Sequence, residues 1–250
     1  DTWIALITLT FLEIVLGIDN IIFISISANK LAKEEQKKAT FWGLTFAMIT
    51  RILLLFSVSY LIAFKNPFYS IHRPWLNVEI TGQSLILILG GIFLLYKSTK
   101  EIRHKMEPNH DKNKESKSKN TISLSTVILQ IIIIDIVFSF DSILTAVGMT
   151  NGVDGALTIM IIAVIVSMLI MMIFANTVSQ LVNKNPTIQM LALSFLILIG
   201  FMLITEGAHL SHLEIFNKTV GVIPKGYLYL AIIFSLCVEL LNMSVRKKND

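Results

Sequence analysis

Two long apolar stretches of the chain carry acidic residues at the same spacing. Glu13 and Asp19 lie six residues apart in the string FLEIVLGIDNI, and Asp135 and Asp141 lie six residues apart in IIDIVFSFDSI. A charged side chain at the centre of a membrane helix costs about 2.5 to 3.5 kcal/mol on insertion scales, so four would cost on the order of 10 kcal/mol. We therefore expect these carboxylates to bind a cation, or to hold protons in its absence.

The alternative interpretation is a set of buried ion pairs. Arg51 and Lys97 are the bases that could act as partners, and Glu206 adds a fifth acid to the apolar stretches. Two bases cannot neutralise five acids, so an excess of negative charge remains. We interpret Arg51, Lys97 and Glu206 as charge-compensating or coupling groups of an ion site.

The apolar stretches offer only oxygen ligands, because histidine is absent from them. Carboxylate, amide and hydroxyl oxygens suit hard divalent ions such as Mn²⁺, Mg²⁺ or Ca²⁺, whereas copper and zinc prefer nitrogen or sulfur. An anionic substrate would be repelled. The available ligands are Glu13, Asp19, Asn20, Asp135, Asp141, Ser142 and Thr145, with Thr50, Ser167 and Asn176 as further candidates.

Helix geometry separates the two acids of each pair. Residues six apart point about 120° away from each other and are offset by about 9 Å, so Glu13 and Asp19 do not share a face. Glu13 and Asp135 both fall near the middle of their stretches, and we expect them to form a central site. Asp19 and Asp141 either reach that site through locally unwound backbone or guard its two entrances. None of the four should face lipid.

The composition places the whole chain in a membrane. It has 250 residues, of which 54% are hydrophobic and 15% charged, which excludes a water-soluble enzyme. A single cysteine excludes a disulfide-stapled module. The net charge of +4 resides in short connectors and not along an amphipathic face, so we expect no nucleic-acid partner. Catalysis is not expected either, because no nucleophile in the apolar stretches has a histidine base beside it.

Seven stretches are apolar enough to cross a hydrocarbon core of roughly 30 Å, which takes about 20 residues. The sequence therefore predicts an all-α membrane protein with seven transmembrane helices. The spans are Trp3–Ala28, Ala39–Phe64, Thr81–Lys97, Ile122–Met149, Ala156–Val182, Ile188–Thr205 and Tyr227–Val245.

Lysine and arginine are distributed unevenly between the two sides of these spans. Sixteen of the 21 lie on one side and four on the other, and only Arg51 lies within a span. Because basic connectors remain in the cytoplasm, this asymmetry predicts a cytoplasmic C-terminus and an external N-terminus.

The two halves of the chain are related. An offset of 122 residues aligns Glu13 with Asp135, and an offset of 109 aligns the segment Gly91–Lys97 with Gly200–Glu206. Each repeat has three crossings, an odd number, so the second must be inverted relative to the first, which is typical of alternating-access transporters. The predicted organisation is a first three-helix repeat (1–104), a polar cytoplasmic linker (105–121), a second inverted repeat (122–214) and a seventh helix with a basic tail (215–250).

The string EIVLGIDN beginning at Glu13 and the string DIVFSFDSI beginning at Asp135 resemble the TerC family of integral membrane proteins. The strings GGIFLLYKSTKE from Gly90 and IGFMLITEG from Ile199 are similar to that family's third and sixth helices. The resemblance implies a multi-pass protein of the bacterial inner membrane, grouped with LysE-like transporters, in a family linked to manganese export and named for tellurium resistance. By motif it implies an ion-binding set of Glu13, Asp19, Asn20, Asp135, Asp141 and Ser142.

These observations favour an exporter of divalent metal ions with Mn²⁺ as substrate, working by alternating access and exchange for protons. The branch of the family is left open by Ile143-Leu144-Thr145, where some longer members carry proline. Two alternatives remain: export of a cationic organic solute such as lysine, and a membrane adaptor that supports metalation of secreted proteins. Tellurite fits poorly, because an oxyanion prefers arginines to an acidic interior. The sequence leaves the roles of His209, His212 and Glu239 open.

Overall fold

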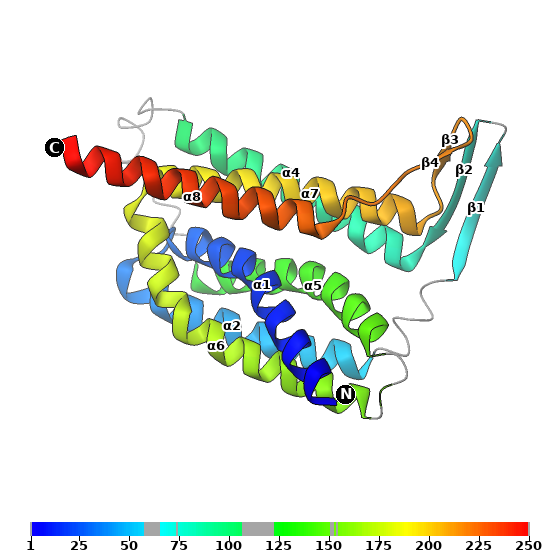
Figure 1. Ribbon diagram of the computed structural model, residues 1–250, viewed down its shortest axis with the longest axis horizontal. Helices are drawn as coiled ribbons and strands as arrows, with labels where there is room; N and C mark the ends of the chain where they lie inside the picture. Colours follow the sequence, from blue (N-terminus) through cyan, green and yellow to red (C-terminus); the bar gives the residue numbers. More distant parts are fainter. Residues whose placement is uncertain are drawn as a thin grey trace. The chain divides into compact units, whose positions relative to one another are not determined.

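The computed structural model describes residues 2–57, 66–73, 75–106, 123–150, 153 and 155–249, and for residues 16, 18, 19, 240 and 246–249 it describes the backbone alone. Long helices dominate these residues (Figure 1). The predicted linker lies outside the described residues except for its first two, which end a helix. The helices are α1 (Thr2–Ala28), α2 (Lys33–Phe56), α4 (Gly82–Met106), α5 (Leu124–Met149), α6 (Ala156–Lys184), α7 (Pro186–Leu210) and α8 (Lys225–Asn249).

Six of these helices are long and apolar enough to cross a membrane, and α4 is not among them. The uninterrupted apolar run of α4, from Leu85 to Tyr96, is short, and Lys97 and further charged residues follow it. A span needs about 20 apolar residues, so α4 reaches this length only if its polar ends are included. Six candidate spans are therefore established, and the seventh crossing stays a prediction.

The outer faces of the helices are apolar. On α1 the side chains of Ile4, Ile7 and Phe11 are 66–69% exposed, and they recur every three or four residues along one face. On α8 only Leu228 and Ile232 are buried among the described apolar side chains. Apolar faces of this extent suit lipid and not water.

The chain packs as two compact units, which we describe separately. Unit 1 contains α1, α2, α5 and α6, with α1 packed along α6 and α2 along α5. Small residues allow both pairs to approach closely: a Cβ on Gly17 would collide with the sulfur of Met171, and a Cβ on Gly43 would lie 2.9 Å from the Ile131 side chain. Unit 1 therefore combines the first two helices of each predicted repeat.

Unit 2 contains α4, α7, α8 and a small sheet. The helices α4 and α7 pack along each other, and α8 contacts α7. A Cβ on Gly91 of α4 would lie 2.6 Å from the carbonyl oxygen of Gly200, and a Cβ on Gly200 of α7 would lie 3.0 Å from that of Gly91. The two glycines that the sequence repeat aligns thus face each other where the helices cross.

The all-α prediction was wrong in one respect, because unit 2 contains a four-stranded antiparallel sheet (Figure 1). Its strands form the order β1-β2-β3-β4, and Arg73 pairs with Leu76 at the β1–β2 turn. The strands lie in the connectors around α4 and α7, where prolines and polar residues indicated only the ends of spans. Their bounds are β1 Pro67–Arg73, β2 Leu76–Thr81, β3 Glu214–Ile215 and β4 Lys218–Thr219.

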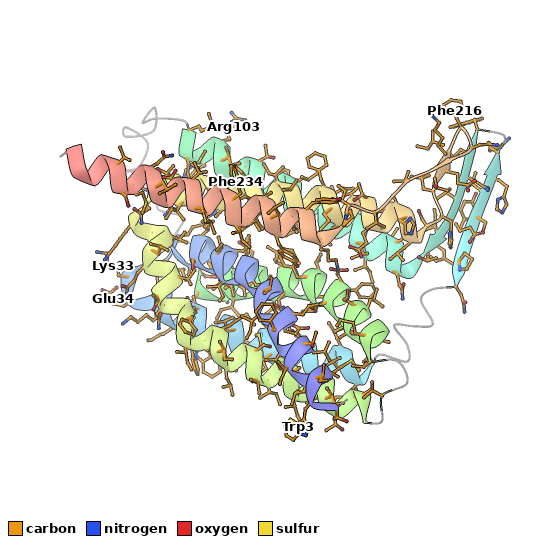
Figure 2. All side chains as sticks on the ribbon, viewed as in Figure 1. Trp3, Lys33, Glu34, Arg103, Phe216 and Phe234 are labelled. Atoms are coloured by element: carbon orange, nitrogen blue, oxygen red, sulfur yellow. The ribbon has the colours of Figure 1, made fainter. Side chains whose placement is uncertain are left out.

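The turn between β3 and β4 uses left-handed backbone at two non-glycine residues, Phe216 with φ 51° and Asn217 with φ 59°. Such a pair of positive φ values suits a two-residue hairpin turn. It leaves the Phe216 side chain 73% exposed at the tip of the sheet, where Figure 2 labels it.

The compact units cut across the sequence repeats. Unit 1 takes residues 1–63 and 109–184, and unit 2 takes residues 64–108 and 185–250. Neither half of the chain is therefore a compact body by itself. The division into repeats stays a prediction about sequence symmetry, and it differs from the division into packed units.

The Gly91–Gly200 crossing yields a first prediction. Gly91→Ala places a methyl group against the Gly200 carbonyl oxygen, and overpacking of this kind costs about 1–3 kcal/mol. We expect a lower midpoint of thermal unfolding in detergent. The matched control is Gly148→Ala, since a Cβ there meets no atom within 4 Å. Equal midpoints for the two variants would contradict the close packing.

Candidate functional site

Glu13 lies in the second quarter of α1 and is 3% exposed. It is buried although α1 shows an apolar outer face at Ile4, Ile7 and Phe11. A carboxylate placed in this way needs a partner, because an isolated buried charge costs several kcal/mol. The partner comes from α2.

Arg51 of α2 is 2% exposed and supplies the only base that contacts Glu13 or Asp135 among the described residues. Its Nη1 donates to Glu13 Oε2 at 2.6 Å, and its Nη2 donates to Asp135 Oδ1 at 2.8 Å. Its Nε lies 3.2 Å from Asp135 Oδ1 and 3.3 Å from Oδ2. One planar guanidinium therefore holds the carboxylates of α1 and α5 together.

Asp135 of α5 accepts two further hydrogen bonds. Asn20 Nδ2 on α1 donates to its Oδ1 at 3.1 Å, and Ser139 Oγ, one turn further along α5, donates to its Oδ2 at 3.1 Å. Asp135 is 4% exposed, so these bonds replace the water that the carboxylate has lost. The contacts fix its orientation from three helices.

The side-chain oxygen of Asn20 has no hydrogen-bond donor among the described residues. Its side chain is 5% exposed, its amide nitrogen points to Asp135, and its Oδ1 accepts no hydrogen bond from the described residues. A buried carbonyl oxygen without a donor is costly and uncommon. Such an oxygen beside a carboxylate is suited to a hard cation.

The cluster contains two acids and one base. Arginine stays protonated in proteins, so with both acids ionised Glu13, Asp135 and Arg51 sum to one negative charge. Asp141, 6% exposed on α5, is a third buried acid in unit 1. The side chain of Asp19 lies outside the described residues.

The predicted ligands are thus brought together only in part. Glu13, Asn20 and Asp135 lie around Arg51, while the Ser142 hydroxyl donates to the backbone oxygen of Ser139. Across the described side chains, no three His, Cys, Asp or Glu residues lie within reach of one metal ion. With its guanidinium in this position the cluster is an ion-paired site, and the six-residue ligand set stays a prediction.

The other predicted groups belong to unit 2. Lys97 is half-buried on α4, and Glu206 Oε1 on α7 lies 3.9 Å from Lys225 Nζ at the start of α8. The ring of His209, in the last turn of α7, hydrogen-bonds the Val220 backbone oxygen, and His212 lies two residues after the end of α7, at the start of the loop that contains Val220. These contacts connect the helices of unit 2 to that loop.

Sequence reasoning missed Ser139 and the bridging geometry of Arg51. The contact of Ser139 could have been predicted from the sequence, because a residue four positions after Asp135 lies on the same helix face. The bridge formed by Arg51 could not have been predicted in this way, because the separation of Arg51 from each acid along the chain does not reveal that α2 packs along α5.

The whole chain, residues 1–250, matches the family model described as the integral membrane protein TerC family. The chain belongs to the TerC family. The resemblance inferred from the two acidic motifs is thereby confirmed.

Relatives of this TerC chain are known from several bacteria. It is 42% identical over 247 residues to a UPF0053 protein of Haemophilus influenzae, covering 99% of this chain and 95% of the relative. It is 41% identical over 249 residues to the UPF0053 inner membrane protein YgdQ of Escherichia coli, covering 100% and 95%. It also matches the inner membrane protein YoaE at 39% identity, covering 98% of this chain but 43% of YoaE. No solved structure matches the chain.

The bridging arginine yields a second prediction. Arg51→Met leaves two buried acids without their counter-charge, and breaking a buried ion pair in this way costs about 3–5 kcal/mol. We expect a large loss of thermal stability in detergent. The triple variant E13Q/R51M/D135N removes all three charges and should recover most of that loss. An R51M protein as stable as the parent would contradict the role of the bridge.

Proposed function

We propose that this TerC family member is a transporter that exports divalent metal ions, with Mn²⁺ as its main substrate. The observation that carries the proposal is the buried cluster of Glu13, Asp135 and Asn20, in which acidic charge exceeds basic charge and one amide oxygen has no donor among the described residues. An ion pair of one acid and one base would carry no such excess.

The ligand chemistry favours a hard ion. Asp135 and Glu13 offer carboxylate oxygens and Asn20 offers an amide oxygen, and these are the donors that manganese, magnesium and calcium select. Among the described side chains of unit 1, no histidine or cysteine stands beside them, which disfavours zinc and copper.

In the absence of metal, Arg51 supplies the positive charge that stabilises the two buried carboxylates. Its guanidinium stands where a cation would balance Glu13 and Asp135, so an arriving metal ion competes with an internal cation. When the guanidinium withdraws, both carboxylates and the Asn20 oxygen become available as ligands. When the metal leaves, the arginine or incoming protons restore the balance, which gives proton exchange a physical basis.

The packing supports an inverted-repeat mechanism. In the proposed repeats, α1, α2 and α4 correspond in that order to α5, α6 and α7. This correspondence relates the contact between α1 and α6 to the contact between α5 and α2, and it relates the contact between α4 and α7 to itself. The reciprocal approach of Gly91 and Gly200 follows the same exchange. We propose seven crossings, an external N-terminus, a cytoplasmic C-terminus and alternating access between the repeats.

Transport can be tested in proteoliposomes by Mn²⁺ flux under an imposed pH gradient. We expect Glu13→Gln, Asp135→Asn and Asp141→Asn to reduce flux to the level of empty liposomes, because each removes a buried acid. Asp19→Asn is the corresponding test for the acid whose side chain is not described. Glu34→Gln, an exposed acid at the start of α2, is the matched control and should transport normally. Normal flux in E13Q and D135N would refute the site.

The substrate class can be tested separately by heat stability. A ligand at 100 times its dissociation constant stabilises a folded protein by about 2.7 kcal/mol. We expect Mn²⁺ to raise the unfolding midpoint of the purified protein, lysine to leave it unchanged, and E13Q to lose the effect of Mn²⁺. Stabilisation by lysine and not by Mn²⁺ would favour export of an organic cation instead.

A further inference from the structure

A pocket of about 490 Å³ that is lined by polar residues lies at one end of unit 1, and it shares no lining residue with the Arg51 cluster. It is formed by the end of α1, the first two turns of α2 and the end of α6. Figure 2 labels Lys33 at this end of the helices. Three lysines line it, namely Lys33, Lys37 and Lys184.

The charge of the pocket selects an anion. The described residues of its lining include no carboxylate, and the neighbouring acids Glu34 and Glu35 are exposed outside it. Three ammonium groups around one cavity repel a divalent metal ion, so the pocket does not continue the acidic site. They attract a phosphate group instead.

The position of two of the lysines strengthens this assignment. Lys33 and Lys37 lie one turn apart, on the same face of α2, within its first two turns. Cations are unfavourable near a helix N-terminus, where the helix dipole is positive, whereas an anion is stabilised there. The N-cap residue Ala32 makes no side-chain capping hydrogen bond. The two lysines therefore destabilise α2 when no anion is bound, and a bound anion removes this destabilisation.

Neutral hydrogen-bonding groups complete the lining. Asn183 Nδ2 donates to Ser179 Oγ at 3.4 Å, and Gln36, Asn176 and Gln180 bring three further amide side chains to the lining. The lysines suit a phosphate, while the amide side chains of the lining suit a hydroxyl group carried by the same ligand.

The membrane contains ligands of this kind at the level where its spanning helices end. The helices α1, α2 and α6 are candidate spans, so their ends lie near the membrane surface. On α2 the exposed rings of Phe41, Trp42 and Phe46 follow the pocket lysines within about three turns and contact one another. Aromatic residues gather at the membrane interface, and basic pockets at the ends of spans bind anionic headgroups.

We propose that this pocket binds the phosphate of an anionic phospholipid headgroup of the phosphatidylglycerol type. Lys33, Lys37 and Lys184 hold the phosphate, and the amide side chains of the lining bind a glycerol hydroxyl. A soluble glycerol phosphate shares this chemistry, and the experiment distinguishes the two sources.

The probe is phosphatidylglycerol, titrated onto the 250-residue chain in detergent micelles and counted as bound lipid by native mass spectrometry. Phosphatidylcholine of the same chain length is the lipid control. We expect K33Q/K37Q to weaken phosphatidylglycerol binding by about 25-fold, about fivefold for each lysine. K38Q/K100Q removes the same charge from exposed lysines outside the pocket and should bind normally. K33R/K37R keeps both charges and should also bind.

The outcomes are distinct. Binding of phosphatidylglycerol that survives an excess of glycerol 3-phosphate supports a headgroup site, and displacement at equal concentration overturns it in favour of a phosphate site filled from solution. Equal binding of phosphatidylglycerol and phosphatidylcholine would overturn the proposal. An equal loss in K38Q/K100Q would overturn it as well, because the lysines would then act only through net charge. The variants replace exposed side chains, and circular dichroism checks that each retains its helices.

Discussion

A guanidinium enclosed by helices keeps its proton, so the packing of unit 1 must be compatible with a permanent positive charge. Arg51 meets this constraint by contacting Glu13 on α1 and Asp135 on α5 at once. The carboxylate oxygens of Asp135 can accept further hydrogen bonds, and Asn20 and Ser139 donate them. The register of three helices against one another thus follows from one side chain. A shift of one residue in any of them would leave a buried charge without its partner.

The same side chain is a point at which the two proposed repeats differ. Glu13 and Asp135 occupy equivalent positions in the two sequence repeats, yet they share a single base. That base comes from α2, while α6, which corresponds to α2 in the proposed repeat, has no lysine or arginine before Lys184. Two inverted repeats with identical charges would present the same energetics to both sides of a membrane. An arginine contributed by one of the proposed repeats removes this equivalence.

Much of this organisation could be predicted because lipid imposes strict rules on sequence. The long helices follow from uninterrupted apolar runs, and the acids of α1 and α5 are conspicuous because lipid makes them costly. Hydropathy could not predict the sheet, since β1 and β2 lie in a connector outside the apolar runs. It could not predict the Arg51 bridge either, because pairing of α2 with α5 is a property of tertiary packing. The lysine-lined pocket was overlooked for a different reason: its lysines were interpreted only as markers of orientation.

The interleaving of the two units has a consequence for biosynthesis. When the first 106 residues have been synthesised, α1 and α2 lack α5 and α6, and α4 lacks α7, so neither unit can close. Glu13 and Arg51 are both present at that stage and can form a one-to-one pair, whereas Asp135 can reach the arginine only after α5 has been made. The glycine face of α4 likewise waits for Gly200. Unit 1 can therefore close only after α6 has been made and unit 2 only after α7 has been made, and until then the nascent first half depends on lipid or on the insertion machinery to cover its unpaired helices.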